Sequence, residues 1–169
     1  MYSQDAFQGH AAPSWIRRLV VAVDGSPASR DGLALAALVA ERTGGQLTVV
    51  HVRHVPAGAN LSSLVAEQVV RTQDELEAEV RAATFEELAG HGVSWDLVVR
   101  AGSPGEEVLK VVKELGADMV VVGSNRHGYL HNALLGSTSA YLASHSPVPV
   151  LVARPRAGVR AVAVNANSL

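Results

Sequence analysis

Two glycines near the C-terminal end of the chain bracket a segment whose residue types favour anion binding. Gly123 directly follows a short apolar run, and Gly136 lies thirteen positions later, in front of Ser137, Thr138 and Ser139. Glycine lets backbone N–H groups approach a ligand closely. The free N–H groups of a helix start, with the helix dipole behind them, favour negative charge. The segment is therefore a candidate phosphate-binding loop, and nucleotide binding is the leading hypothesis.

A second polar turn follows the first apolar run of the chain. Residues 18–23 (RLVVAV) are rich in β-branched side chains and predict a buried strand, which ends at Asp24. Ser26 can cap a helix that begins at Pro27. Taken alone, Asp24 is better explained as a turn residue, and the hydroxyl cluster after Gly136 as a helix cap. Only the combination of these features favours a binding site.

Strand and helix patterns alternate along the chain. Short apolar runs separated by helical patterns predict a single α/β domain with a five-stranded parallel sheet and helices on both faces. In such sheets ligands bind at the carboxyl ends of the strands, where the strand order reverses. The polar residues after the first and fourth strands converge on one crevice if these strands are neighbours. The strands are expected at residues 18–23, 46–52, 95–100, 119–122 and 148–153.

Two of the intervening helices have distinct sequence signatures. Residues 61–90 carry apolar side chains mostly at three- and four-residue steps, and the acidic opposite face is best explained as a solvated surface. Ser103, Pro104 and Glu106 form the pattern of a capping box, with serine at N-cap, proline at N1 and glutamate at N3. This pattern predicts a helix that starts at Pro104.

Composition narrows the class of protein. The chain has 169 residues, a formal net charge of −2, no cysteine and only 4% aromatic residues. The length favours one domain, and the charge gives no support for binding nucleic acid or a membrane surface. No apolar run is long enough for a membrane span, and the N-terminal segment lacks a signal-peptide pattern, so a cytoplasmic protein is expected. The non-periodic segments 1–15 and 155–169 are expected to be flexible tails.

Several catalytic and metal-binding motifs are absent from the sequence. It contains no G-x4-G-K-[ST] loop, no G-x-G-x-x-G after the first strand and no G-x-S-x-G. The pairs His51/His54 and His127/His131 lack the further ligands that zinc requires, so no metal site is expected. The glycine-bracketed loop holds no evident general base, and the sequence therefore does not predict an enzyme.

Two long stretches resemble the universal stress protein family. They read VAVDGSPASRDGLALAALVAERTGGQLTVVHV and VVVGS…LLGSTSAYLASHSPVPVLVAR, and the resemblance covers residues 18–154. The ATP-binding members of this family carry the motif G-x2-G-x9-G-[ST]. In this chain Gly123, Gly136 and Ser137 match the first glycine and the closing pair of that motif at the proper spacing.

Arg126 stands where the family motif has its middle glycine, and Gly128 lies two residues further on. If the backbone there needs a positive φ, the arginine carries a strain of about 1–2 kcal/mol and its Cβ crowds the phosphates. If Gly128 adopts that conformation instead, the guanidinium of Arg126 can contact a triphosphate. The second alternative is favoured, because Asn125 and Gly128 both tolerate left-handed turns.

The resemblance implies a fold, a ligand and a set of binding residues. The fold is Rossmann-like, of the adenine nucleotide alpha hydrolase type, with strand order 3-2-1-4-5 in a domain at residues 16–154. The ligand is ATP, with Mg²⁺ as its counter-ion. The implied binding residues are Asp24 and Gly25 at the adenosine, Val52 beside the adenine, Gly123, Ser124, Asn125, Arg126 and Gly128 near the ribose and phosphates, and Gly136, Ser137 and Thr138 on the phosphate oxygens.

The strand at 148–153 lies at a sheet edge in this order. An exposed apolar edge is a template for pairing, and twofold pairing buries it in both copies, so a homodimer through this strand is expected. Three functional classes remain open. They are a nucleotide-dependent regulator in stress response, a family member that acts only through protein contacts, and a slow ATPase. The glycine-bracketed loop favours the first.

Overall fold

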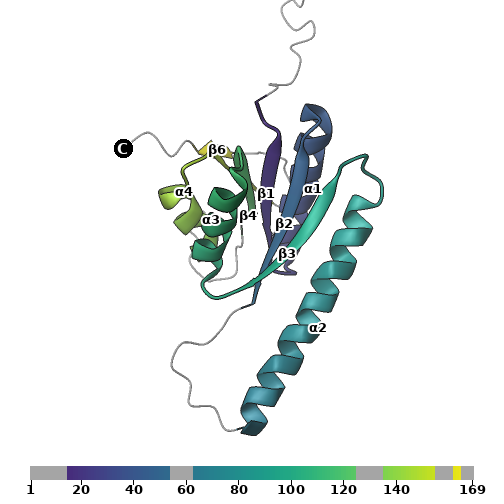
Figure 1. Ribbon diagram of the computed structural model, residues 1–169, viewed down its shortest axis with the longest axis vertical. Helices are drawn as coiled ribbons and strands as arrows, with labels where there is room; N and C mark the ends of the chain where they lie inside the picture. Colours follow the sequence, from purple (N-terminus) through teal and green to yellow (C-terminus); the bar gives the residue numbers. More distant parts are fainter. Residues whose placement is uncertain (1–14, 54–62, 125–134, 155–161, 165–169) are drawn as a thin grey trace, which may run out of the picture.

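The computed structural model describes residues 15–53, 63–124, 135–154 and 162–164, which form alternating strands and helices (Figure 1). Element ends agree with the sequence patterns to within about two residues, which is the usual uncertainty of such boundaries. In chain order the elements are β1 (Arg18–Val23), α1 (Pro27–Thr43), β2 (Gln46–Arg53), α2 (Ser63–Leu88), β3 (Trp95–Ala101), α3 (Pro104–Leu115), β4 (Met119–Gly123), α4 (Ser137–His145), β5 (Val150–Ala153) and β6 (Val162–Val164).

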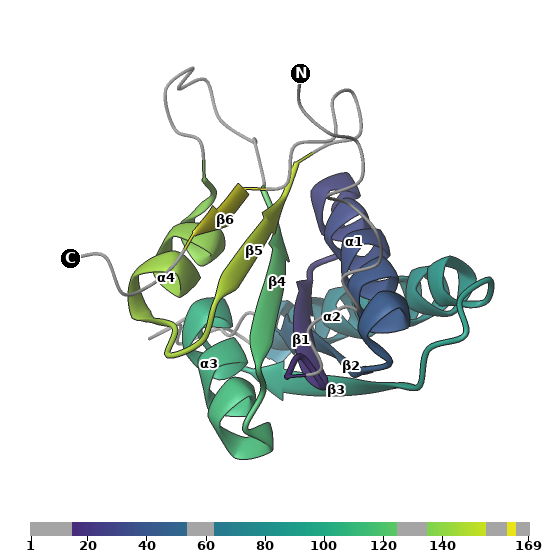
Figure 2. The same cartoon turned by 90° about the horizontal axis from the view of Figure 1, so that it is seen from above.

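The first five strands form a parallel sheet in the order β3-β2-β1-β4-β5, so the predicted fold is confirmed. Helices α1 and α2 cover one face, and α3 and α4 cover the other (Figure 2). Because side chains alternate along a strand, each face has its own apolar core. In β1, for example, Val21 faces the α1 and α2 core and Val20 the α3 and α4 core.

A sixth strand, β6, changes one edge of the sheet. It pairs antiparallel with β5 and places Ala163 opposite Leu151. The expectation that β5 is an edge strand is therefore wrong for this structure, since β4 and β6 flank it on both sides. Three residues are too few to show a periodic pattern, so β6 was hidden within the segment interpreted as a tail. The predicted strand start at residue 148 also moves to Val150.

Helix α1 lies unusually close to the end of β4. A Cβ added to Gly123 would lie 2.1 Å from the carbonyl oxygen of Ala28, and one added to Gly32 would lie 3.0 Å from the backbone nitrogen of Gly123. Real Cβ atoms essentially never lie as close to backbone atoms as 2.1 Å, so Gly123 must be a glycine, whereas a Cβ at Gly32 would need the backbone to shift by a few tenths of an ångström. The two glycines thus hold the start of α1 against the carboxyl end of β4.

Helix α2 is longer than the sheet it covers. Its 26 residues span about 39 Å at 1.5 Å per residue. Val80, Thr84 and Leu88, all in its C-terminal half, are buried against the sheet and α1. The N-terminal half extends past the carboxyl ends of the strands (Figure 1), and Val70 there is 56% exposed. In the described part of the chain no helix combines the length and the apolar character needed to cross a membrane.

Candidate functional site

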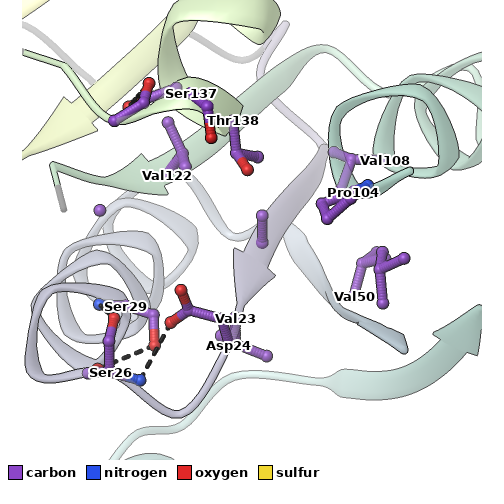
Figure 3. A pocket seen from close by; sticks show the side chains of 15 residues that line it. Val23, Asp24, Ser26, Ser29, Val50, Pro104, Val108, Val122, Ser137 and Thr138 are labelled. Atoms are coloured by element: carbon purple, nitrogen blue, oxygen red, sulfur yellow. Dashed lines mark hydrogen bonds between the residues drawn. The ribbon is translucent and has the colours of Figure 1, made fainter. Parts of the chain in front are cut away.

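A cavity of about 230 Å³ opens at the carboxyl ends of β1, β2 and β4 (Figure 3). It lies where the strand order reverses, because β1 pairs with β2 on one side and with β4 on the other. This is the place where open α/β sheets bind ligands. The cavity is lined by Ala22, Val23, Asp24, Ser26, Ser29, Val50, Val52, Pro104, Val108, Val122, Gly123, Gly136, Ser137, Thr138 and Ser139.

Asp24 supplies a carboxylate at one side of the cavity. Its Oδ1 accepts a hydrogen bond from the backbone N–H of Ser26 at 2.9 Å, and the Ser26 hydroxyl in turn accepts from the N–H of Ser29 at 3.2 Å. Burial acts to raise the pKa of Asp24, but hydrogen bonding from Ser26 and, to a smaller extent, from Ser29 outweighs it and holds that pKa below its ordinary value. The group is therefore ionised at neutral pH and can accept hydrogen bonds from ligand hydroxyl or amino groups.

The start of α4 lies across the cavity from Asp24 (Figure 3). Its N-cap is Gly136, and no side chain of the described residues caps this helix. The start of α1, by contrast, is capped by the Ser26 side chain. Ser137, Thr138 and Ser139 of this turn all line the cavity, and the Ser139 hydroxyl donates to the Gly136 carbonyl at 3.0 Å. An uncapped helix start with adjacent hydroxyls suits a phosphate group.

The remaining wall of the cavity is apolar. Val50 and Val52 come from β2, while Pro104 and Val108 come from the first turns of α3 (Figure 3). Such a surface suits the flat face of a nucleobase, because pockets for organic ligands are mostly apolar with a few placed polar groups. The cavity thus combines an apolar wall, a carboxylate and an anion-favouring helix start.

The structure places most of the residues implied by the sequence in this cavity, but not all. The described residues among them that line it are Asp24, Val52, Gly123, Gly136, Ser137 and Thr138. Gly25 does not, because it lies on the other side of the β1–α1 turn, under Leu76 and Val80 of α2. Ser124 is buried beside the cavity, with no hydrogen-bond partner for its hydroxyl among the described residues. Asn125, Arg126 and Gly128 lie outside the described residues.

Gly123 has a packing role in addition to its place in the cavity wall. A Cβ on this residue would meet the carbonyl of Ala28 on α1, while the expected approach of its backbone to a phosphate stays a prediction. Helix packing therefore requires a glycine at this position, which also lines the cavity.

Sequence reasoning missed the α3 side of the cavity and Ser29. Pro104 directly follows β3 and starts α3, so its place at the carboxyl edge of the sheet was available from the predicted topology. Val108 belongs to the apolar core under α3 as well as to the cavity wall. No sequence motif indicated that Ser29 would line the cavity, because its position there depends on how α1 packs on the sheet. Among the described residues, no group of three or more His, Asp or Glu side chains could hold a metal ion.

The sheet order and the cavity define a class, namely α/β proteins with a ligand crevice at the strand switch point. Comparison with known proteins narrows this class to one family. The model of the universal stress protein family matches residues 16–154, and the chain belongs to that family. The resemblance inferred from the sequence is confirmed.

Individual relatives support the assignment. The universal stress protein YxiE of Bacillus subtilis is 32% identical over 146 residues, which cover 81% of this chain and 98% of YxiE. The structure of the universal stress protein UspA from Lactobacillus plantarum superposes with a TM-score of 0.71 at 21% identity, over 86% of this chain and 98% of UspA. At that identity the structural likeness demonstrates the fold alone.

Two further solved structures of similar fold contain nucleotides. One is a universal stress protein in complex with cAMP, with a TM-score of 0.63 at 20% identity over 82% of this chain and 97% of that one. The other is a universal stress protein family protein from Arabidopsis thaliana with AMP bound, with a TM-score of 0.61 at 18% identity over 82% and 91% of the two chains.

Proposed function

We propose that this protein is a cytoplasmic, ATP-binding regulator in stress response that takes the nucleotide in the cavity at the strand switch point. The observation that carries the proposal is the placement of Asp24 and the uncapped start of α4 on opposite sides of one cavity. The cAMP and AMP held by two proteins of similar fold support an adenine nucleotide as the ligand.

The described residues fit such a ligand in three parts. The apolar wall of Val50, Val52 and Pro104 would receive the adenine. Asp24 would accept hydrogen bonds from the ribose hydroxyls. The first turn of α4 would donate backbone N–H groups to the phosphates, with Mg²⁺ as their counter-ion.

Arg126 adds a hypothesis about the terminal phosphates. Its guanidinium would fold over the triphosphate and form a charge-assisted contact, so its loss would weaken ATP more than AMP. A homodimer through the outer edge of β5 also remains part of the proposal. Because β6 occupies that edge, such a dimer requires β6 to leave β5.

The decisive experiment uses the substitution Gly136→Asp. Gly136 has φ −70°, which any residue adopts, and an aspartate at N-cap hydrogen-bonds the helix N–H groups that the phosphates would use. The new charge also repels the phosphates. We expect calorimetry to show at least tenfold weaker ATP binding for Gly136→Asp, with no loss of thermal stability.

Ser103→Asp is the matched control, because it places the same charge at the start of α3, where Ser103 is the N-cap. It should retain more of the ATP affinity than Gly136→Asp. Absence of ATP binding by the unsubstituted protein would favour the alternative function, regulation through protein contacts alone. Release of ADP from bound ATP would favour the slow ATPase.

A further inference from the structure

The cavity shares two chain segments with helix α2. Val52 of β2 lines the cavity, and the next residue, Arg53, lies on the opposite face of the strand because side chains alternate. Arg53 reaches α2 there. Its Nε donates to Oε2 of Glu77 at 2.8 Å, and its Nη2 forms an ion pair with Oδ1 of Asp74 at 2.8 Å.

The same arrangement occurs at the end of β1. Asp24 lines the cavity, and the next residue, Gly25, faces α2. Gly25 has φ +82°, and a Cβ built on it would lie 3.2 Å from Cδ1 of Leu76 and 3.5 Å from Cγ2 of Val80. The helix therefore packs directly on the backbone of the β1–α1 turn.

The two ion pairs of Arg53 differ in exposure: the Asp74 side chain is 58% exposed, whereas the pair with Glu77 is partly shielded from solvent. The side chains of Arg53 and Glu77 are 32% and 20% exposed, so solvent screens their attraction less than at an open surface. Hydrogen bonding from Arg53 holds the pKa of Glu77 below its ordinary value, against the opposing effect of burial. Arg81 also pairs with Glu77, at 3.3 Å, but from one turn further along the same helix.

These contacts fall at the level where α2 leaves the body of the protein. Beyond Leu76, toward the C-terminus, the helix is held by the buried residues Val80, Thr84 and Leu88. On its N-terminal side the described residues are exposed or half-buried, and the helix projects past the sheet (Figure 1). The attachments at Arg53 and Gly25 therefore set how firmly the projecting half is held.

We propose that α2 responds to occupancy of the cavity, through Arg53 and Gly25, and so presents a nucleotide-dependent surface. This inference rests on the proposed function. A ligand held against Val52 and Asp24 restricts the backbone of both segments. The restriction passes to Arg53 and Gly25, which are the next residues in the chain, and fixes the ion pairs and the packing under Leu76. The backbone hydrogen bonds in the projecting half of α2 then break less often by local unfolding.

Hydrogen exchange with and without ATP tests this directly. In the unsubstituted protein, saturating ATP should slow amide exchange over residues 69–79 by at least about fivefold, the lower end of typical coupling between sites. In Arg53→Gln this slowing should largely disappear. By reciprocity, the same substitution should weaken ATP binding by the factor by which the coupling falls.

Arg81→Gln is the matched control. Like Arg53→Gln, it removes one of the two arginines that pair with Glu77. It leaves the ion pair between β2 and α2 intact. It should retain the ATP-dependent slowing. Equal slowing in Arg53→Gln and in the unsubstituted protein would overturn the role of Arg53. Calorimetric binding of ATP without any slowing would overturn the inference while the proposed function stands, whereas absence of binding would overturn both.

Discussion

The carboxylate of Asp24 shows how one residue can serve both the backbone and a cavity. Its hydrogen bond with the Ser26 N–H fixes the β1–α1 turn, while the same residue lines the cavity. The interpretation as a turn residue and the interpretation as a binding residue are therefore compatible, because a carboxylate has several acceptor sites.

Asp24→Asn should destabilise the protein slightly at neutral pH. The folded-state pKa of Asp24 lies below its ordinary value, so its charge stabilises the fold above the unfolded pKa of about 3.9. This contribution is lost as the pH falls through the lower folded pKa. Although its carboxylate is partly desolvated, Asp24 as a whole remains open to solvent, so we expect only about 0.5 kcal/mol at pH 7. Urea unfolding at pH 7 and below pH 4 should show the difference from Asp24→Asn shrinking at acid pH; a constant difference would contradict this.

Gly123→Ala should destabilise the protein strongly, because its Cβ would meet the Ala28 carbonyl at 2.1 Å and force α1 away from β4. We expect a loss of about 3 kcal/mol or more in the free energy of unfolding. Gly90→Ala is the matched control, since nothing lies within 4 Å of its added Cβ. A denaturant series that finds equal effects for both substitutions would exclude the packing role.

Gly123 shows which properties of a single residue can be predicted from the sequence pattern and which cannot. The sequence singled out the glycine because of its place after an apolar run and its spacing to Gly136. It could not show which atoms the glycine faces, because Ala28 is far away in sequence and reaches Gly123 only through the packing of α1 on β4. Gly25, which the family resemblance implies near the adenosine, likewise packs against Leu76 and Val80 of α2, which no local pattern indicated.

Among the elements, α1 and α3 begin with the same Ser-Pro pair but are capped differently. The Ser26 hydroxyl accepts from the Ser29 N–H, whereas Ser103 makes no side-chain cap hydrogen bond, so the predicted capping box is not formed. Sequence placed both helix starts correctly because proline at N1 fixes the backbone. It could not predict the rotamer of Ser103, which depends on the surroundings of a single side chain.

Ser26→Ala should therefore cost more stability than Ser103→Ala. Loss of a working cap costs about 1 kcal/mol, and loss of an unused hydroxyl less than about 0.5 kcal/mol. The two changes remove the same atom from the same position of two helices, so each controls for the other. Thermal unfolding of both variants measures the difference, and a larger loss for Ser103→Ala would reverse the assignment.

For the whole molecule, the strand order was predictable and the sheet edge was not. Four βα units leave few topologies open, because parallel crossovers are right-handed and the family resemblance supplied the order. β6 escaped because an antiparallel strand of three residues needs only a few backbone hydrogen bonds to an existing edge. Such a strand leaves almost no trace in hydrophobic periodicity.

A chain that ends at Arg154 lacks β6 and should self-associate more strongly than the full chain. Its β5 edge would expose the backbone groups and apolar side chains of Val150–Ala153 to a second copy. We expect the dimer dissociation constant to fall at least tenfold in sedimentation equilibrium. An unchanged constant would show that β6 does not compete for this edge, and would remove the reason for placing the dimer there.

The central position of β1 has a consequence for synthesis of the chain. In the folded protein β1 pairs on one side with β2, where Leu19 lies opposite Leu47, and on the other with β4, where Leu19 lies opposite Met119. During synthesis the second pairing can form only after β4 has been translated. The backbone N–H groups of Arg17 and Arg18 likewise donate to Asp118, at 2.8 Å each. At about 5–20 residues per second, translation delivers β4 roughly 5–20 s after β1. During that interval the nascent chain carries an unpaired, apolar strand edge, which makes it a natural client for ribosome-associated chaperones.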